Sequence, residues 1–121
     1  MAAVPPLHHV AVRVEDCGRA LRFYSELLGL RELRRRERDG IVESVWLDAG
    51  GVILMVERTL RGSGAATGSG HVLAFAVDDL AAWAARLRAA GQTIDDRTDH
   101  TLYTRDPDGH RVGLTVFPAS E

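Results

Sequence analysis

The chain has 121 residues, of which 45% are hydrophobic and 26% charged, and this balance predicts one globular domain. A formal net charge of -2 excludes a general positive field for nucleic acid, and no apolar run approaches the roughly 20 residues of a membrane-spanning helix. The N-terminal residues lack the pattern of a secretory signal, and the single cysteine, Cys17, has no partner for an internal disulfide. We therefore expect a cytoplasmic protein with no nucleic-acid or membrane partner.

The first half of the chain predicts a strand, a helix and three further strands. The apolar run at 7–14 carries branched side chains typical of a strand, and Glu15 and Asp16 after it can cap a helix. Gly29 stands where a helix ends in the left-handed conformation. The strand-like segments that follow are 30–38, 41–48 and 51–57.

The second half repeats this order after a connector at 58–70 that is rich in glycine, serine and threonine. An apolar run at 71–77 predicts a strand, and a helix follows an acidic pair and ends at Gly91. The last three strand candidates are 92–98, 101–105 and 110–117.

The two halves also agree in register. The valines that precede the two acidic pairs lie 63 residues apart, and this offset matches His9 with Val72. The aspartates that open the two hairpin turns lie 58 residues apart, and that offset matches Met55 with Gly113. The sequence therefore predicts two βαβββ modules.

Three stretches resemble the vicinal oxygen chelate superfamily, the group of glyoxalases, bleomycin-resistance proteins and dioxygenases. The motifs FYSELLGL and DPDGH within them are typical of this fold, although one fold hosts many chemistries. The stretches are HHVAVRVEDCGRALRFYSELLGL (8–30), HVLAFAVDDLAAW (71–83) and LYTRDPDGHRVGL (102–114).

The resemblance implies an α+β fold in which two βαβββ modules form a cup-shaped, eight-stranded mixed sheet. A small-molecule site would lie inside the cup, and two copies of the chain would pair as a homodimer. The single domain 1–121 would then consist of a first module at 7–57, a linker at 58–70 and a second module at 71–117.

Metal-dependent members of the superfamily hold a divalent ion with side chains from four strands, and the ion chelates neighbouring substrate oxygens. The ligands are a histidine in the first strand, a carboxylate in the fourth, a histidine in the fifth and a glutamate in the eighth. His9 fits the first of these positions. The other three hold Met55, Val72 and Gly113, which are not ligands for a hard divalent ion.

Two other side chains could replace missing ligands. Glu57 shares a strand face with Met55, and His71 lies one residue before Val72, on the opposite face unless a bulge turns it inward. We therefore expect no metal cofactor, with nickel, zinc, iron or manganese as the alternative.

The inward strand faces predict a ligand site that is mostly apolar. Trp46 and Met55 suit a planar or lipophilic ligand, and Arg13 is the expected counter-charge for an anionic one. Gly113 leaves extra room by lacking a side chain, and Tyr103 resembles an active-site tyrosine of the fosfomycin-resistance thiol transferases. The predicted ligand-binding residues are His9, Arg13, Trp46, Met55, Val72, Tyr103 and Gly113.

Three further expectations concern neighbouring residues. Pairing Leu47 with Val52 would place Trp46 beside Ile53 in the hairpin. His8 and His71 occupy equivalent positions of the repeat and are interpreted as partly buried packing residues. The arginine-rich stretch 31–38 is interpreted as a solvated strand edge protected by charge.

These residues favour metal-independent binding of a small aromatic or amphipathic molecule, as in the bleomycin-resistance branch. The alternative is a metal-dependent lyase, isomerase, thiol transferase or ring-cleaving dioxygenase that uses His9 with relocated ligands. A third hypothesis is an accessory or regulatory domain. The sequence leaves open whether the protein is an enzyme.

Overall fold

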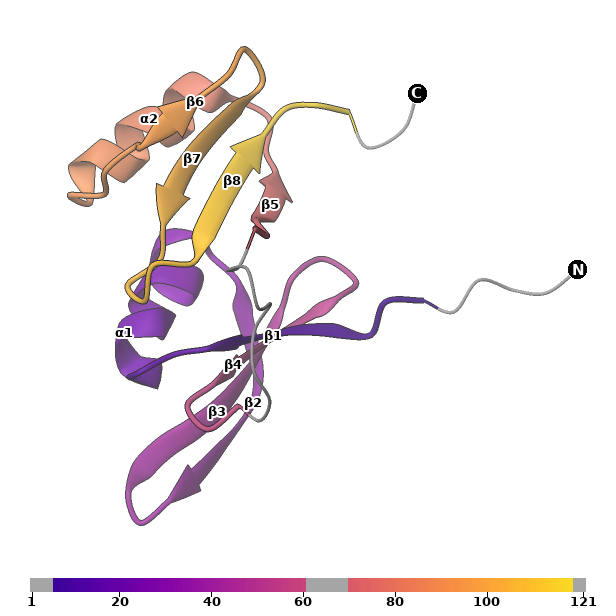
Figure 1. The fold of residues 1–121 in the computed structure, drawn as a ribbon, viewed down its shortest axis with the longest axis vertical. Helices are drawn as coiled ribbons and strands as arrows, with labels where there is room; N and C mark the ends of the chain where they lie inside the picture. The colour runs from indigo at the N-terminus through magenta and orange to yellow at the C-terminus, as the bar shows by residue number, and fades with distance from the viewer. Residues whose placement is uncertain (1–5, 61–69, 119–121) are drawn as a thin grey trace, which may run out of the picture. The chain divides into compact units, whose positions relative to one another are not determined.

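The computed structural model describes residues 6–60 and 70–118 and divides the chain into two compact units, Met1–Gly62 and Ser63–Glu121 (Figure 1). We call them the N-terminal unit and the C-terminal unit, and each is described by itself. Each contains one four-stranded mixed sheet, as the predicted α+β fold requires. No helix within the described residues is both long and apolar enough to cross a membrane.

The sheet of the N-terminal unit has the strand order β1-β4-β3-β2, with β1 parallel to β4 and the other neighbours antiparallel. Its central strands alternate buried and less buried side chains because one face packs on a helix. The strands are β1 (His9–Arg13), β2 (Arg31–Arg38), β3 (Ile41–Asp48) and β4 (Ile53–Glu57).

The helical segment of this unit begins at the predicted acidic cap. The Asp16 carboxylate accepts hydrogen bonds from the backbone N–H groups of Gly18 and Arg19, which starts α1 (Cys17–Leu21). The chain continues as a π-helical turn, η1 (Arg22–Leu27), and leaves it at Gly29 with φ 88°. The helix α1 packs against β3 and β4. The core comprises Val12, Ala20, Tyr24, Val45, Leu47, Leu54 and Val56.

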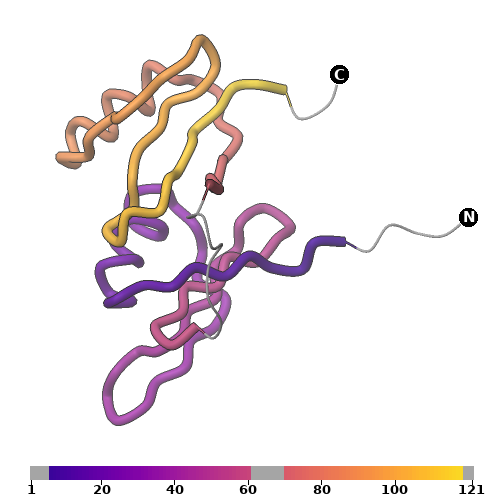
Figure 2. The backbone as a smooth tube through the Cα atoms, viewed as in Figure 1, coloured from indigo at the N-terminus to yellow at the C-terminus, as the bar shows by residue number. Residues whose placement is uncertain are grey.

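The C-terminal unit repeats this plan with the strand order β5-β8-β7-β6, and β5 is parallel to β8. Its helix packs against β7 and β8 and is capped by Asp79, whose side chain accepts from the Ala82 N–H. Figure 2 shows β5, β8 and β7 running side by side in this unit. The elements are β5 (Leu73–Ala76), α2 (Leu80–Ala89), β6 (Asp96–Arg97), β7 (Thr101–Arg105) and β8 (Arg111–Thr115).

The strand pairing confirms the register of the repeat. Ala11 on β1 pairs with Met55 on β4, and Ala74 on β5 pairs with Gly113 on β8. The two pairs are separated by the offsets of 63 and 58 residues that the sequence predicts. Met55 and Gly113 therefore hold equivalent places in the two sheets.

The sixth strand is much shorter than the predicted 92–98. Side-chain contacts replace ladder pairing at its start, because the Gln92 amide donates to the Thr104 hydroxyl and to the backbone carbonyl of Arg105. Regular pairing is limited to Asp96 and Arg97. The predicted strand is therefore too long at its start, because the sequence does not show that Gln92 binds the neighbouring strand through its side chain.

The hairpin between β3 and β4 pairs two residues further along β4 than predicted. Asp48 faces Ile53, and Trp46 faces Met55 instead of Ile53. The Asp48 carboxylate accepts from the Gly50 N–H, and this contact sets the turn that fixes the register. The difference does not change which side chains share a face, because moving the pairing by two positions preserves the alternation.

The interpretation of His8 and His71 as packing residues is wrong, since both are exposed. The strands begin at His9 and Leu73, so each histidine lies before its strand and not beneath a helix. The His8 ring instead lies edge-on to the Trp46 ring, with 6.4 Å between the centroids.

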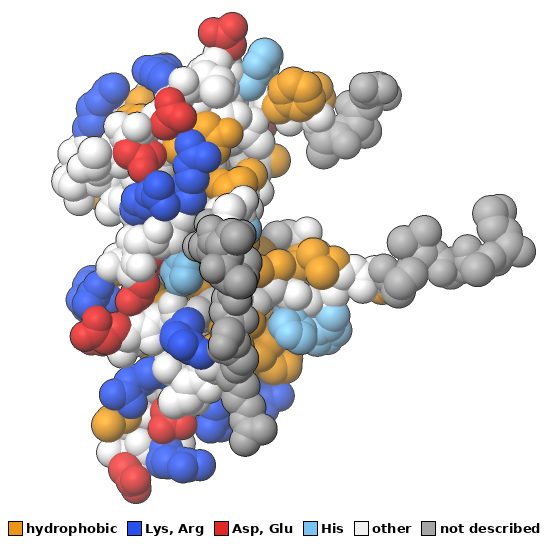
Figure 3. All heavy atoms as spheres, in the orientation of Figure 1, with side chains coloured by type: hydrophobic (Ala, Val, Ile, Leu, Met, Phe, Trp, Pro, Cys, Tyr) orange, Lys and Arg blue, Asp and Glu red, His pale blue; other side chains and the backbone are white. Residues whose placement is uncertain are grey.

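The edge strand β2 carries alternating charges along its exposed length. Arg35 pairs with Glu32 at 2.6 Å, and Arg36 pairs with Glu43 at 3.3 Å. Figure 3 shows arginine and acidic side chains interspersed near the end of the β2–β3 hairpin. Charge of this kind protects an edge strand from pairing with another chain, as predicted for residues 31–38.

Candidate ligand-binding site

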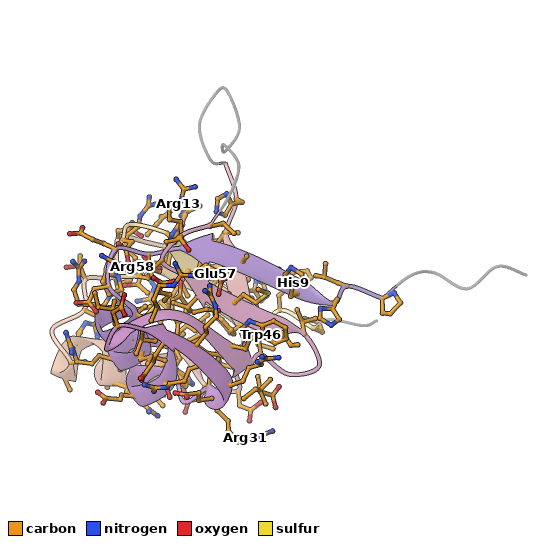
Figure 4. All side chains as sticks on the ribbon, turned by 90° about the horizontal axis from the view of Figure 1, so that it is seen from below. His9, Arg13, Arg31, Trp46, Glu57 and Arg58 are labelled. Carbon is orange, nitrogen blue, oxygen red and sulfur yellow. The ribbon has the colours of Figure 1, made fainter. Side chains whose placement is uncertain are left out.

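The N-terminal sheet has a helix-free face, defined by alternate residues of three strands. Val12, Val45 and Leu54 are buried on the helix side, so their neighbours along each strand point to the other side. Figure 4 shows His9 and Trp46 toward one end of this unit and Glu57 toward the other. The helix-free face carries His9, Ala11 and Arg13 on β1, Ser44 and Trp46 on β3, and Ile53, Met55 and Glu57 on β4.

A cavity of about 180 Å³ opens on this face. Trp46 and Met55, which are direct cross-strand partners, form its apolar wall. The Arg34 guanidinium lies over the Trp46 ring, 5.0 Å from the ring centroid, in a cation–π contact. The cavity is lined by Arg34, Arg35, Arg36, Ser44, Trp46, Met55 and Glu57.

The polar side of the cavity is a hydrogen-bonded pair. The Ser44 hydroxyl donates to the Glu57 carboxylate across the β3–β4 pair, and Ser44 is buried. A buried hydroxyl without a partner would destabilise the sheet, so this bond also explains why two polar residues are tolerated here. Among the described residues, Arg34 has no carboxylate partner, unlike its neighbours Arg35 and Arg36.

Two predicted ligand-binding residues on β1 lie outside the cavity lining. His9 is exposed, and its Nδ1 lies 2.9 Å from Nδ1 of His8, so one ring donates and the other accepts. The Arg13 guanidinium donates to the backbone carbonyl of Leu60 and points away from Trp46 (Figure 4). Arg34, and not Arg13, is therefore the cation placed over the aromatic ring.

The other predicted residues lie in the C-terminal unit. Tyr103 on β7 pairs with Gly113 on β8, and its ring covers the space beside the glycine. A Cβ atom at Gly113 would lie 3.3 Å from Cε1 of Tyr103 and 3.3 Å from Cγ2 of Thr101. The expectation of extra room at Gly113 is therefore wrong. The Arg111 guanidinium stacks on the same ring at 3.9 Å, and Val72, which precedes β5, is 41% exposed.

The residues at the four family ligand positions do not fit a divalent metal. Met55 is packed beside Trp46, and a Cβ atom at Gly113 would be in tight contact with the Tyr103 ring, which would have to shift to admit a side chain. The proposed substitute Glu57 accepts a hydrogen bond from Ser44, and His71 precedes its strand with its ring centroid 6.3 Å from that of His110. Across residues 6–60 and 70–118, no three His, Cys, Asp or Glu side chains gather in a way that could hold a metal ion.

Electrostatic shifts occur at the margin of the N-terminal sheet. Burial, followed by the charges of Glu57 and Asp16, raises the pKa of the Cys17 thiol, so this cysteine is not an activated nucleophile. The hydrogen bond from Arg35 lowers the pKa of Glu32. The backbone N–H of Gly50 lowers the pKa of Asp48 in the hairpin turn.

Sequence reasoning missed the role of β2 in this site. The stretch 31–38 was assigned to solvent as a whole, yet Arg34 and Arg36 pair with Trp46 and Ser44 on β3. Successive side chains of a strand point to opposite faces of the sheet, so every second side chain of an edge strand lies on the helix-free face. The signal in the sequence that could have indicated this role is the pairing of Arg34 with Trp46 across the predicted hairpin of residues 31–38 and 41–48.

The two βαβββ units define the fold class of this chain. The chain belongs to the Glyoxalase/Bleomycin resistance protein/Dioxygenase superfamily, whose family model matches residues 6–114. This assignment confirms the resemblance noted in the sequence.

Individual relatives include both enzymes and binding proteins. The chain is 28% identical over 122 residues to a probable lactoylglutathione lyase of Vibrio parahaemolyticus, with 88% of this chain and 86% of the relative covered. It also resembles the fosfomycin resistance protein FosX of Mesorhizobium loti, with a TM-score of 0.75, 21% identity and coverage of 98% and 96%. TnmS3, an antibiotic-binding protein from a Streptomyces species, gives a TM-score of 0.72 at 23% identity, with coverage of 95% and 98%. The last two likenesses show the shared fold.

Proposed function

We propose that the protein binds a small aromatic or amphipathic molecule without a divalent metal. The observation that carries this proposal is the cavity of the N-terminal sheet, where Trp46 and Met55 form an apolar wall beneath the Arg34 guanidinium. An indole ring and a thioether offer stacking, dispersion and sulfur–aromatic contacts to a planar guest.

The polar groups of this cavity would orient the ligand. Arg34 can balance an anionic substituent, and the Ser44–Glu57 pair can exchange hydrogen bonds with hydroxyl or amine groups. With about 180 Å³, the cavity is smaller than the 300 Å³ or more of typical ligand pockets, so it suits one ring of a larger molecule. His9 and Arg13 on the same face, and Val72, Tyr103 and Gly113 in the C-terminal unit, stay proposed ligand contacts.

A metal-dependent enzyme is the second candidate. It is favoured by the likeness to the probable lactoylglutathione lyase and by His9, which holds a family ligand position. Such an enzyme would use nickel, zinc, iron or manganese and would need Glu57 as a replacement ligand. The hydrogen bond between Ser44 and Glu57, and the packing of Met55 beside Trp46, favour the metal-independent proposal.

We also infer that the protein works as a homodimer in the cytoplasm with a small molecule as its partner. The support is its family, whose members pair to complete their sites, and the single cysteine, which has no partner for an internal disulfide.

The proposal is tested by a fluorescence and calorimetric screen against aromatic metabolites and antibiotics. The matched pair of variants is Trp46→Ala, which removes the cavity wall, and Trp83→Ala, which removes the tryptophan of α2. We expect Trp46→Ala to weaken binding of a hit by about 2–4 kcal/mol, as for a packed aromatic anchor, and Trp83→Ala to leave it unchanged. Hits that bind equally well to both variants would contradict the site.

A further inference from the structure

A second pocket, of about 190 Å³, lies in the C-terminal unit. It is formed by the residues just before β5 and by the turn between β7 and β8. It shares no lining residue with the cavity on the N-terminal sheet, and its residues all belong to one unit. Two histidines and two arginines give it its chemistry, and none of its lining residues is acidic. The lining comprises Gly70, His71, Val72, Arg105, Gly109, His110 and Arg111.

The two arginines of this pocket face each other across the sheet. Arg105 at the end of β7 and Arg111 at the start of β8 are direct cross-strand partners. Like charges at directly opposite positions destabilise an antiparallel pair. Each arginine is already paired with an aspartate, Asp95 or Asp96, and an anion between the two guanidinium groups would reduce their repulsion further.

Existing contacts engage only part of each guanidinium. Arg105 donates from Nε to Asp95 at 3.0 Å and from Nη1 to the Gly109 carbonyl at 3.1 Å. Arg111 donates from Nη2 to Asp96 at 3.1 Å and lies over the Tyr103 ring. A guanidinium has five N–H donors, so both arginines keep donors that have no partner among the described residues.

Two imidazole rings complete the pocket. The ring centroids of His71 and His110 are 6.3 Å apart with 36° between the planes, which is too far apart for close stacking. The ring nitrogens of His71 add hydrogen-bonding groups beside the arginines. The Asp106 carboxylate in the turn between β7 and β8 is buried and accepts from the backbone N–H groups of Asp108 and His110.

We propose that this pocket binds a tetrahedral oxyanion, namely the phosphate group of a small molecule. Arginine N–H groups match the oxygens of such a group in charge and geometry, and charge-assisted hydrogen bonds are stronger than neutral ones. The pocket volume fits an anionic head group and not a whole drug-sized ligand. The proposal is independent of the aromatic site on the N-terminal sheet.

A metal ion is the competing occupant, because two histidines are common ligands of zinc and nickel. The guanidinium groups of Arg105 and Arg111 line the same pocket and would repel a cation. The two histidines also have no carboxylate or thiolate beside them in the lining. The anion is therefore the occupant that the side chains favour.

The test is a titration of the full chain with inorganic phosphate at constant ionic strength, followed by the NMR signals of the histidine rings. His71→Gln and His110→Gln assign the two signals. We expect both signals to shift saturably with phosphate, and Arg105→Gln and Arg111→Gln each to weaken the affinity by about tenfold or more. His71→Gln, at an exposed position outside the strands, keeps the test valid if an arginine variant does not fold, and it should weaken binding as well.

Matched controls separate a site from a general ionic effect. His100→Gln changes an exposed histidine of the same unit outside the pocket, and Arg38→Gln removes an exposed arginine of the N-terminal unit. Both should bind phosphate as the unaltered protein does. The proposal is wrong if phosphate gives no saturable shift, if acetate shifts the signals equally, or if zinc and not phosphate gives the response that depends on His71 and His110.

Discussion

At the scale of single residues, Gly113 shows how one position can exclude a metal ligand by packing. Its neighbours are the Tyr103 ring, at 3.3 Å from an added Cβ, and the Arg111 guanidinium stacked on that ring. The equivalent position in the other unit holds Met55, with Arg34 over Trp46. Both sheets thus place an arginine and an aromatic ring beside the positions at which the family resemblance implies carboxylate ligands.

Replacing Gly113 by glutamate should therefore destabilise the protein. We expect Gly113→Glu to lower the free energy of unfolding by about 1–3 kcal/mol, because the new side chain meets Tyr103 and Thr101. In a Tyr103→Ala background the same substitution should cost less, since the ring has been removed. Urea denaturation of the four proteins of this cycle measures the coupling, and additive effects would contradict the packing argument.

The buried thiol of Cys17 predicts a pH dependence of stability. Its pKa is raised in the folded protein, so the unfolded chain loses this proton first as the pH rises above the ordinary value of about 8.5. The protonated thiol therefore contributes to the free energy of unfolding below that pH, and this contribution is lost as the pH rises toward the pKa of Cys17 in the folded protein. Denaturation at several alkaline pH values should show a steeper loss for the unaltered protein than for Cys17→Ala, by up to about 1.4 kcal/mol per pH unit. If the free energy of unfolding falls equally with pH in both proteins, the thiol makes no pH-dependent contribution to stability.

The strand pairing confirms the register that the repeat predicts for Met55 and Gly113. A strand of period two then fixes which side chains share a face. His9 was matched to a ligand position through the family resemblance, and its role in a site stays a prediction. Arg34 could not be assigned in this way. Its position over Trp46 depends on the pairing of β2 with β3, and that pairing contains irregularities near Glu32 and Arg36.

At the scale of elements, strands with strong turn signals were predicted to within a residue or two. The segments 41–48 and 101–105 match β3 and β7. Two features were not predictable from periodicity. The helix after Asp16 changes to π-helical geometry at Arg22, and β6 is shortened because the Gln92 side chain takes over backbone contacts.

The β2–β3 hairpin depends on a turn in which both central residues have positive φ. Asp39 has φ 53° and Gly40 has φ 77°, which is typical of a type I′ turn. Gly40→Ala should destabilise the protein by about 1 kcal/mol through conformation alone, because no atom lies within 4 Å of the added Cβ. The matched control is Gly70→Ala, which also meets open space but has no positive φ. Equal unfolding free energies for the two variants would contradict this explanation.

At the scale of the whole molecule, the prediction is a homodimer. Each sheet ends in edge strands, and twofold pairing is the commonest way in which proteins of one chain type cover such edges. Light scattering at micromolar concentration should give twice the monomer mass of 13.2 kDa. A single species of 13.2 kDa would contradict the prediction.

The central claim is that ligand binding on the N-terminal sheet needs Trp46 and no divalent metal. The most direct measurement is calorimetric titration of one aromatic hit into the full chain, first with a chelator and then with added nickel, zinc, iron or manganese. We predict the same affinity in every case, because Met55 and the Ser44–Glu57 pair leave no ligand set for a metal beside Trp46. Binding that disappears with the chelator, returns with one of the metals and is lost in His9→Ala would contradict the claim.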